Sequence, residues 1–74
     1  MSVTAVIVTW NSADLLAACL KSCRKFGVPA VVVDNASRDA TIAVARDSRW
    51  ATVIRNPENR GFAAAVNQGV LSAA

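Results

Sequence analysis

Short apolar runs alternate along the chain with longer stretches in which apolar residues recur at helical spacing. The runs Val3–Thr9, Ala30–Asp34 and Ala51–Arg55 are rich in β-branched residues and predict strands. The stretches that follow them predict helices. The resulting order, β-α-β-α-β-α, is typical of a parallel sheet with right-handed crossovers, and it predicts an α/β protein whose strands are buried on both faces.

The first helix has clear signals at both of its ends. Asn11 or Ser12 can act as its N-cap, and Asp14 falls in its first turn, where a negative charge is favourable. Gly27 predicts its end, and Pro29 reinforces the stop. Its apolar face is predicted to consist of Leu15, Leu16, Cys19, Leu20 and Cys23.

The second and third helices follow the same logic. Ser37 is predicted to cap the second helix, with Asp39 near its start. Ile42 and Ala45 are predicted to face inward. The third helix is predicted to begin after Gly61. The residues expected along its inner side are Phe62, Val66, Gly69 and Val70.

The 74 residues allow one domain at most, yet 54% of them are hydrophobic. A chain of this size buries only about 60% of its unfolded surface, so this apolar content is generous for an independent domain. The last stretch is still helical in character and carries no stop signal. We therefore expect residues 1–74 to be a partial domain, truncated at its C-terminus.

The net charge of +3 comes from eight Lys and Arg against five Asp and Glu. Lys21, Arg24 and Lys25 fall near the end of the first helix, where cations complement the helix dipole. The other five cations are scattered among acidic residues, whereas a nucleic-acid-binding protein is expected to cluster them. The charge pattern therefore predicts that nucleic acid is not a partner.

Cys19 and Cys23 lie four residues apart on the first helix, where a disulfide would have poor geometry. Two cysteines without any histidine do not form a zinc site. Free thiols suit a reducing compartment. The N-terminus lacks the basic residues of a signal peptide, and its apolar run is too short to span a membrane. These features predict a cytoplasmic protein.

Polar residues follow two of the predicted strands. Asp34, at the end of the second strand, is predicted to contact a ligand, either by accepting hydrogen bonds from a base or ribose or by ligating a metal; the alternative is that it caps the helix or braces the following loop. Asn35 has the same two alternatives, and Ser37 and Asp39 are interpreted as structural. These residues lie at the edge of a parallel sheet where ligands bind.

The loop before the third helix is the second candidate. Gly61 permits close approach of the backbone to a ligand, and the N-terminus of the helix favours anions. Arg60 can pair with a phosphate or remain solvated, and Asn67 can face either a ligand cleft or water. The sequence lacks the glycine-rich dinucleotide fingerprint and the P-loop lysine motif. Without histidine, it also cannot build a Ser-His-Asp triad.

Three ordered segments resemble the beginning of the family 2 inverting glycosyltransferases, which have the GT-A fold. Val6-Ile-Val-Thr9-Trp10-Asn11 is similar to the first strand and turn of that family. Val31 to Thr41 resembles its D-[NG]-x-S-x-D-x-T segment, and Asn56 to Gly69 resembles its N-x-x-N-x-G-x-x-x-x-x-N-x-G segment. The pairs Trp10-Asn11 and Asp34-Asn35 are similar to the rhamnosyltransferase-like branch.

The resemblance implies a partial Rossmann-like parallel sheet, the nucleotide-binding half of a GT-A fold, with a nucleotide-diphosphate sugar as partner. By this resemblance, the pocket for the base and ribose would be lined by Thr9, Asn11, Asp34 and Asn35. The ribose or diphosphate would be approached by Arg60 and Gly61, and Asn67 would support that side. The family holds a divalent metal, Mg²⁺ or Mn²⁺, on a later D-x-D-like motif and uses a later carboxylate as general base. Neither motif occurs in these residues, so no catalytic residue is assigned and we expect no sugar transfer by this chain alone.

The alternative interpretation is a small, non-catalytic α/β module that binds a nucleotide or a partner. Two further expectations follow from the resemblance. The longer protein can lie at the periphery of the inner face of the membrane. In the GT-A fold the first strand is flanked on both sides, so Val3–Thr9 would here expose an open edge, and we expect self-association through it.

Overall fold

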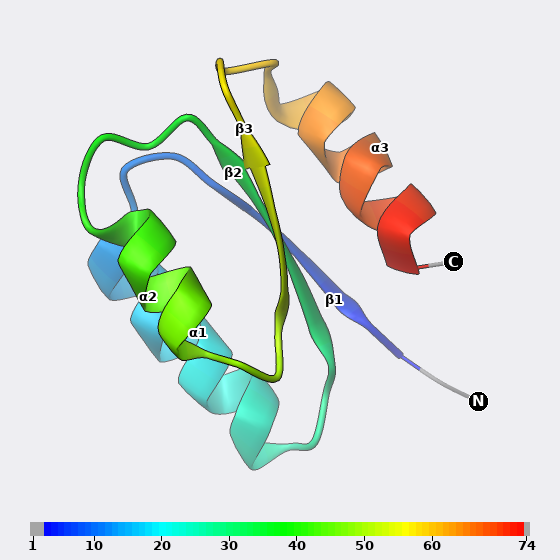
Figure 1. Ribbon diagram of the computed structural model, residues 1–74. Helices are drawn as coiled ribbons and strands as arrows, with labels where there is room; N and C mark the ends of the chain where they lie inside the picture. Colours follow the sequence, from blue (N-terminus) through cyan, green and yellow to red (C-terminus); the bar gives the residue numbers. More distant parts are fainter. Residues whose placement is uncertain (1–2, 74) are drawn as a thin grey trace.

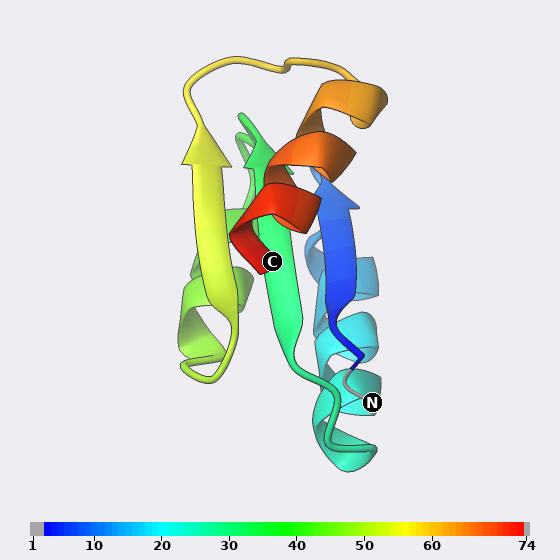
Figure 2. The same ribbon diagram turned by 90° about the vertical axis from the view of Figure 1, so that its right-hand side faces the viewer.

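The computed structural model describes residues 3–73, which form a three-stranded parallel sheet with helices on both faces (Figure 1). The strands lie in the order β1 (Ala5–Thr9), β2 (Ala30–Asn35) and β3 (Thr52–Asn56). One face of the sheet is covered by α1 (Ala13–Lys25) and α2 (Thr41–Asp47), and the other by α3 (Phe62–Ala73) (Figure 2). The predicted α/β fold with alternating strands and helices is therefore confirmed.

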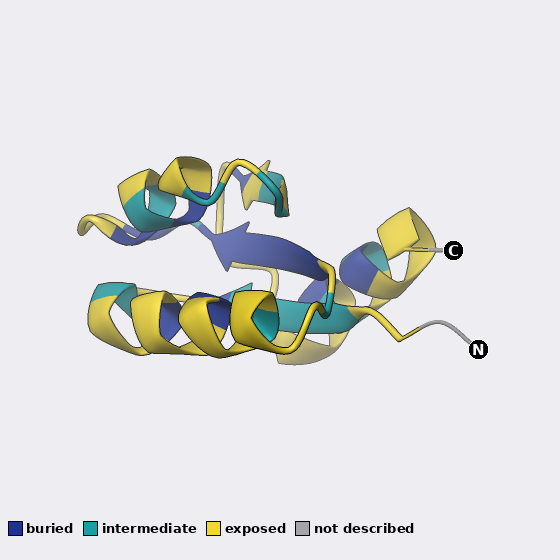
Figure 3. Ribbon diagram, turned by 90° about the horizontal axis from the view of Figure 1, so that it is seen from below, coloured by how far each residue is buried: buried dark blue, intermediate teal, exposed yellow. Residues whose placement is uncertain are grey.

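The central strand separates two apolar clusters. All six residues of β2 are buried (Figure 3). Val32 packs with Leu16 and Leu20 on the side of α1 and α2, whereas Val33 packs with Ala65 on the side of α3. Successive side chains of a strand point to opposite faces, and for that reason one strand supplies both clusters. Helices on both faces of β2 explain its uninterrupted apolar run.

The strand boundaries differ from the predicted ones by one or two residues. The first strand begins at Ala5, which is in register with Ala30, whereas Val3 is 64% exposed. The second strand extends through Asn35, because this residue still pairs with Asn56 of β3. Periodicity finds the apolar centre of a strand, but its ends depend on where pairing with the neighbour stops.

The first helix, α1, begins and ends where the sequence predicts. Ser12 occupies the N-cap position, although its hydroxyl donates to the Trp10 carbonyl instead of to the helix. At the other end, the Val28 N–H donates to the Cys23 carbonyl at 2.8 Å. This hydrogen bond closes a turn of six residues, from Cys23 to Val28. Gly27 follows the last helical turn with φ of 67°. This is the Schellman type of helix end, in which free carbonyls are satisfied by the returning chain.

The apolar face of α1 is narrower than predicted. Leu16 and Leu20 are buried, but Leu15 is 77% exposed and Cys19 is also exposed. Leu15 and Leu16 are adjacent and therefore point about 100° apart around the helix, and only one of these directions faces the sheet. The prediction that Leu15 and Cys19 belong to the core is wrong.

The cysteines are free thiols, as predicted. Burial raises the pKa of the Cys23 thiol, and the neighbouring Cys19 raises it further. The raised pKa makes Cys23 less reactive at neutral pH, because the thiolate is the nucleophilic form.

The second helix begins later than Ser37 predicts. The residue before its first turn is Ala40, and Ser37 makes no cap, because its hydroxyl and N–H both donate to the Asp34 carboxylate. Ala45 is buried and Ile42 is half-buried, as expected for the inward face.

The inner side of α3 is formed by its smallest residues. Ala65 and Gly69 are buried, whereas Phe62 and Val70 are 74% and 53% exposed. A Cβ atom added to Gly69 would lie 2.3 Å from Val6 Cγ1. The prediction holds for Gly69 and for the half-buried Val66 but is wrong for Phe62 and Val70, because size, rather than hydrophobicity alone, decides which residues fit where the helix closely approaches the sheet. None of the helices within residues 3–73 is long and apolar enough to cross a membrane.

Candidate nucleotide-binding site

The polar residues at the carboxyl edge of the sheet divide between its two faces. Asp34 and Asn35 are adjacent in β2, so their side chains point in opposite directions. Thr9 is in register with Asp34, and Asn56 is in register with Asn35. Two separate hydrogen-bond networks result, one on the side of α1 and α2 and the other on the side of α3.

The first network surrounds the Asp34 carboxylate, which is fully buried. Its Oδ1 accepts hydrogen bonds from the hydroxyls of Thr9 (2.8 Å) and Ser37 (2.5 Å), and its Oδ2 accepts the Ser37 N–H at 2.9 Å. Of the two predicted roles, the structure therefore displays the loop-bracing one, and contact of Asp34 with a ligand stays a prediction.

The β1–α1 loop is fixed to the β2–α2 loop. The Asn11 N–H donates to the Ser37 hydroxyl at 2.8 Å, and the Asn11 Oδ1 accepts the Arg38 N–H at 2.8 Å. One residue later, the Ser12 N–H donates to the Thr41 hydroxyl at 2.9 Å. Asn11 has φ of 48°, which asparagine tolerates better than most residues. These bonds make the two loops one connected wall.

Asp39 belongs to the same wall and is exposed. Its carboxylate accepts hydrogen bonds from the hydroxyl and the N–H of Thr41, the latter at 2.9 Å. These bonds favour the ionised form and lower the pKa of Asp39 below its ordinary value. Asp39 therefore contributes a fixed negative charge and holds the first residue of α2.

The second network consists of three amide side chains. Asn56 is buried and exchanges two hydrogen bonds with Gln68, at 2.7 and 2.8 Å. Its Nδ2 also donates to the Asn35 Oδ1 at 3.0 Å. The amide pair joins the end of β3 to α3, and Asn35 joins both to β2.

Asn35 also holds the loop that precedes α3. Its Nδ2 donates to the Gly61 carbonyl at 3.2 Å, and its Oδ1 accepts the Arg60 N–H at 3.4 Å. Gly61 has φ of 82°, a conformation that side chains disfavour. Asn35 thus orients this loop, one of the two alternatives predicted for it, while its contact with a ligand stays a prediction.

Asn67 lies outside this network. It is exposed on α3, whereas the adjacent Gln68 makes the contact with β3. Gln68 and Asn56 were missed by the sequence reasoning. Asn56 directly follows the predicted third strand, as Asn35 directly follows the predicted second strand, and this repeated position was the available signal.

A cleft of about 900 Å³ opens at the carboxyl edge, between the wall formed by the first two loops and the β3–α3 loop. Its lining is composed of Trp10, Asn11, Ala36, Ser37, Arg38, Arg55, Asn56, Pro57, Glu58 and Asn59. Trp10 is 58% exposed. Of the seven predicted binding residues, Asn11 lines this cleft directly. Thr9, Asp34 and Asn35 are buried at the strand ends from which its walls emerge.

The sequence reasoning did not single out Trp10, Arg38 or Arg55 as contacts. The signal for Trp10 was a large aromatic residue placed directly after a strand end, where burial is not expected. The two arginines come from different loops or strands and are brought to one cleft only by the fold.

No set of three or more carboxylate, thiol or imidazole side chains within residues 3–73 is arranged to hold a metal ion. The carboxylates described above make hydrogen bonds within the chain instead. The described residues therefore do not fit a divalent-metal centre of their own.

Comparisons with known proteins identify the family. The sequence matches the model of Glycosyl transferase family 2 over residues 4–74. A comparison with curated proteins found no match. The structure is similar to the mannosyltransferase from Pyrobaculum calidifontis in complex with GDP-Man and Mn²⁺, with a TM-score of 0.82 and 31% sequence identity.

That similarity covers 97% of this chain and 24% of the mannosyltransferase chain, so this chain spans about a quarter of its length. The structural match supports the GT-A type of nucleotide-binding fold that the sequence motifs predicted. Because the family match extends over nearly the whole sequence, the chain belongs to glycosyl transferase family 2.

Proposed function

We propose that the cleft binds the nucleotide of a nucleotide-diphosphate sugar and that the chain is the nucleotide-binding part of a glycosyltransferase. Such an enzyme transfers the sugar to an acceptor hydroxyl in glycan or cell-surface polysaccharide synthesis. The observation that carries the proposal is the cleft at the carboxyl edge of a parallel sheet, where open α/β proteins bind ligands. The similar mannosyltransferase, which contains GDP-Man, supports it.

The chemistry of the lining suits a nucleotide. The exposed indole of Trp10 offers a face on which a base can stack. Arg38 and Arg55 supply guanidinium groups, which pair with phosphate oxygens in a bidentate manner. The side-chain amides of Asn11 and Asn59 can donate to or accept from a base or ribose.

The other predicted residues act on this site through its walls. Thr9 and Asp34 hold Ser37, and Ser37 in turn accepts the Asn11 N–H. Asn35 holds Arg60 and Gly61 in the opposite loop. We propose Thr9, Asp34 and Asn35 as positioning residues, and we retain their contact with the base and ribose as a proposal. Arg60 and Gly61 are proposed to approach the ribose or diphosphate, with Asn67 supporting that side.

The donor and the compartment stay at the level of proposals. The similarity of Trp10-Asn11 and Asp34-Asn35 to the rhamnosyltransferase-like branch is the support for placing the chain in that branch. The free thiols support a cytoplasmic location. A divalent ion, Mg²⁺ or Mn²⁺, is supported by the Mn²⁺ of the mannosyltransferase, but we assign none of its ligands to residues 3–73.

Calorimetric titration of the chain with GDP, UDP and dTDP tests the proposal. We expect weak binding, and we expect Trp10→Ala to reduce the affinity about tenfold through lost stacking. Phe26→Ala is the matched control, because Phe26 is also an exposed aromatic residue but follows α1 at the opposite edge of the sheet. Equal affinities of the wild type and a folded Trp10→Ala variant would show that the nucleotide does not bind in this cleft.

A further inference from the structure

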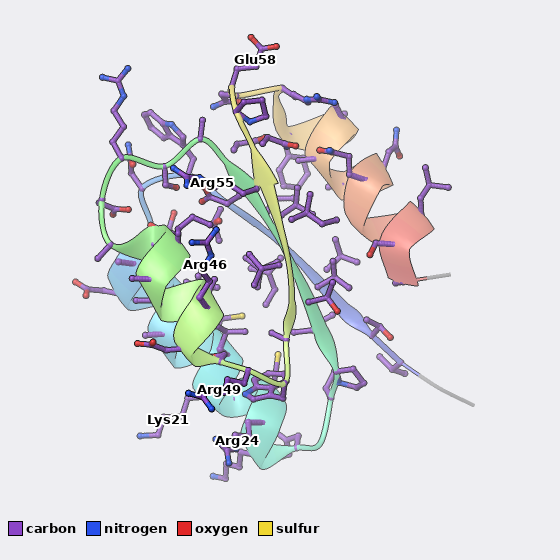
Figure 4. All side chains as sticks on the ribbon, in the orientation of Figure 1. Lys21, Arg24, Arg46, Arg49, Arg55 and Glu58 are labelled. Atoms are coloured by element: carbon purple, nitrogen blue, oxygen red, sulfur yellow. The ribbon has the colours of Figure 1, made fainter. Side chains whose placement is uncertain are left out.

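The charges are distributed unequally between the two edges of the sheet. Four of the eight cationic side chains belong to the second half of α1 and the loop after α2, namely Lys21, Arg24, Lys25 and Arg49, whereas Figure 4 shows Arg46 higher up beside α2. Of the five acidic residues, only Asp47, at the end of α2, adjoins this region. The others lie in the first turn of α1, at the end of β2 and in the two loops of the carboxyl edge. The fold thus produces a positive amino edge.

Side chains from separate elements meet at this edge. Lys21 and Arg24 of α1 line one groove together with Trp50, which follows Arg49 in the α2–β3 loop. Asp47 lines the same groove and offsets one of the positive charges of this edge. Figure 4 shows Lys21, Arg24 and Arg49 at the same lower end of the molecule. Because these three cations come from two segments that are distant in sequence, it is the fold, with α1 packed against α2, that brings them to one edge.

An exposed aromatic residue lies beside these cations. Phe26 follows the last turn of α1 and is 74% exposed, and the Lys25 Nζ lies 5.6 Å from the centre of its ring. We name Lys21, Arg24, Lys25, Phe26 and Arg49 the basic tip. The helix dipole accounts for cations in the last turn of α1, but it accounts neither for Arg49 from another segment nor for the exposed ring.

We propose that the basic tip docks on an anionic membrane surface. Clustered Lys and Arg side chains are attracted to acidic headgroups, and an aromatic ring among them can enter the interfacial region. A bilayer suits this surface better than RNA, because the tip has a single strongly exposed aromatic residue, whereas single-stranded RNA is bound by several aromatic rings on which successive bases stack. The inference goes beyond the proposed nucleotide binding and does not depend on it.

The geometry of the fold makes docking and nucleotide binding compatible. The tip lies where α1 ends, whereas the cleft lies where the strands end and α1 begins. In a parallel sheet these are opposite edges (Figure 1). A membrane bound at the tip therefore leaves the cleft open to solvent.

Sedimentation with vesicles tests the proposal, using phosphatidylcholine alone and phosphatidylcholine mixed with phosphatidylglycerol. We expect the chain to bind only the mixed vesicles and to be released by salt, because screening weakens the attraction. The triple variant Lys21→Gln, Arg24→Gln, Lys25→Gln should bind roughly a hundredfold more weakly, at about fivefold for each cation. Phe26→Ala should weaken binding roughly threefold to tenfold.

The matched control removes the same charge from the opposite edge, with Arg38→Gln, Arg55→Gln and Arg60→Gln. Its binding should stay within about threefold of the wild type, with circular dichroism checking that both variants are folded. Equal losses in the two triple variants would show that net charge alone attracts the chain, and they would overturn the proposal. Binding to neutral vesicles, no binding to mixed vesicles at low salt, or tighter binding to polyuridylic acid than to mixed vesicles would also overturn it.

Discussion

The carboxylate of Asp34 joins three parts of the chain: the end of β1 through Thr9, the end of β2 to which it belongs, and the loop that contains Ser37. A buried carboxylate is unfavourable unless its oxygens are hydrogen-bonded, and here both are. The same bonds determine where the Asn11 backbone lies, because its N–H donates to Ser37. At the scale of the residue, stability and the shape of the cleft therefore depend on one side chain.

We expect Asp34→Ala to lower the free energy of unfolding by about 2–4 kcal/mol, since the buried donors of Thr9 and Ser37 would lose their acceptor. Urea denaturation followed by circular dichroism measures the change. Asp47→Ala, which removes an exposed carboxylate from α2, should change it by less than about 0.5 kcal/mol. An Asp34→Ala variant as stable as the wild type would exclude the bracing role. A loss of nucleotide binding in Asp34→Ala could come from a lost contact with the nucleotide or from displacement of the loops that form the cleft. Trp10→Ala is therefore the sharper probe of the cleft.

At the scale of the element, α3 lies unusually close to the sheet at Gly69. A glycine inside a helix costs about 1 kcal/mol relative to alanine, so the helix alone would be improved by a substitution. The Cβ atom of an alanine would, however, lie 2.3 Å from Val6 Cγ1 and 3.2 Å from Val33 Cγ2. These side chains belong to β1 and β2, both of which α3 contacts. The sheet therefore determines which residue the helix carries.

Gly69→Ala is expected to destabilise the chain by about 1–2 kcal/mol, because overpacking outweighs the gain in helix propensity. The free energy of unfolding in urea gives the measurement. Ser72→Ala serves as the control, since it makes a comparable change at an exposed position of the same helix. If Gly69→Ala proved more stable than the wild type, the helix would be free to move away from the sheet without loss.

At the scale of the whole molecule, the three-stranded sheet has two open edges, β1 and β3. The β3 edge carries the exposed Arg55, and a charged residue discourages pairing with another strand. The β1 edge consists of Val6, Ile7 and Val8, which are only half-buried. Self-association through β1, predicted from the sequence, stays a prediction, and the apolar composition of this edge supports it.

The direction of the backbone groups supplies a specific test. The Ala5 N–H donates to Pro29 next to β2, and N–H groups alternate in direction along a strand. The Val6 N–H should therefore point to the open edge. We expect light scattering to show a mass that rises with concentration, and Val6→Pro to weaken this association roughly tenfold by removing the outward N–H donor of residue 6.

Val6→Thr is the control, because it keeps the N–H and nearly the same shape. It should associate as the wild type does. A wild-type chain that stays monomeric across the concentration series would contradict self-association. Equal association of folded Val6→Pro and Val6→Thr would instead locate it away from β1.

The order and type of the elements were determined by the sequence alone. β-branched runs, helical spacing and the stop at Gly27 are local signals, and each acts within a few residues of the chain. The three family segments were equally visible, because they are contiguous, and they identified the family that the comparisons confirmed. The position of the candidate site at the carboxyl edge followed from the alternation of strands and helices.

Only the tertiary structure decided which residues meet. The pairing of Asn56 with Gln68, the turn of Ser37 toward Asp34 and the approach of Trp50 to Lys21 and Arg24 all depend on how separate elements pack. The same is true of the inner side of α3, where close packing selects Ala65 and Gly69 over larger apolar residues. Hydrophobic pattern measures the preference of each residue for burial, whereas the contacts of a site depend on distances between segments that no local pattern encodes.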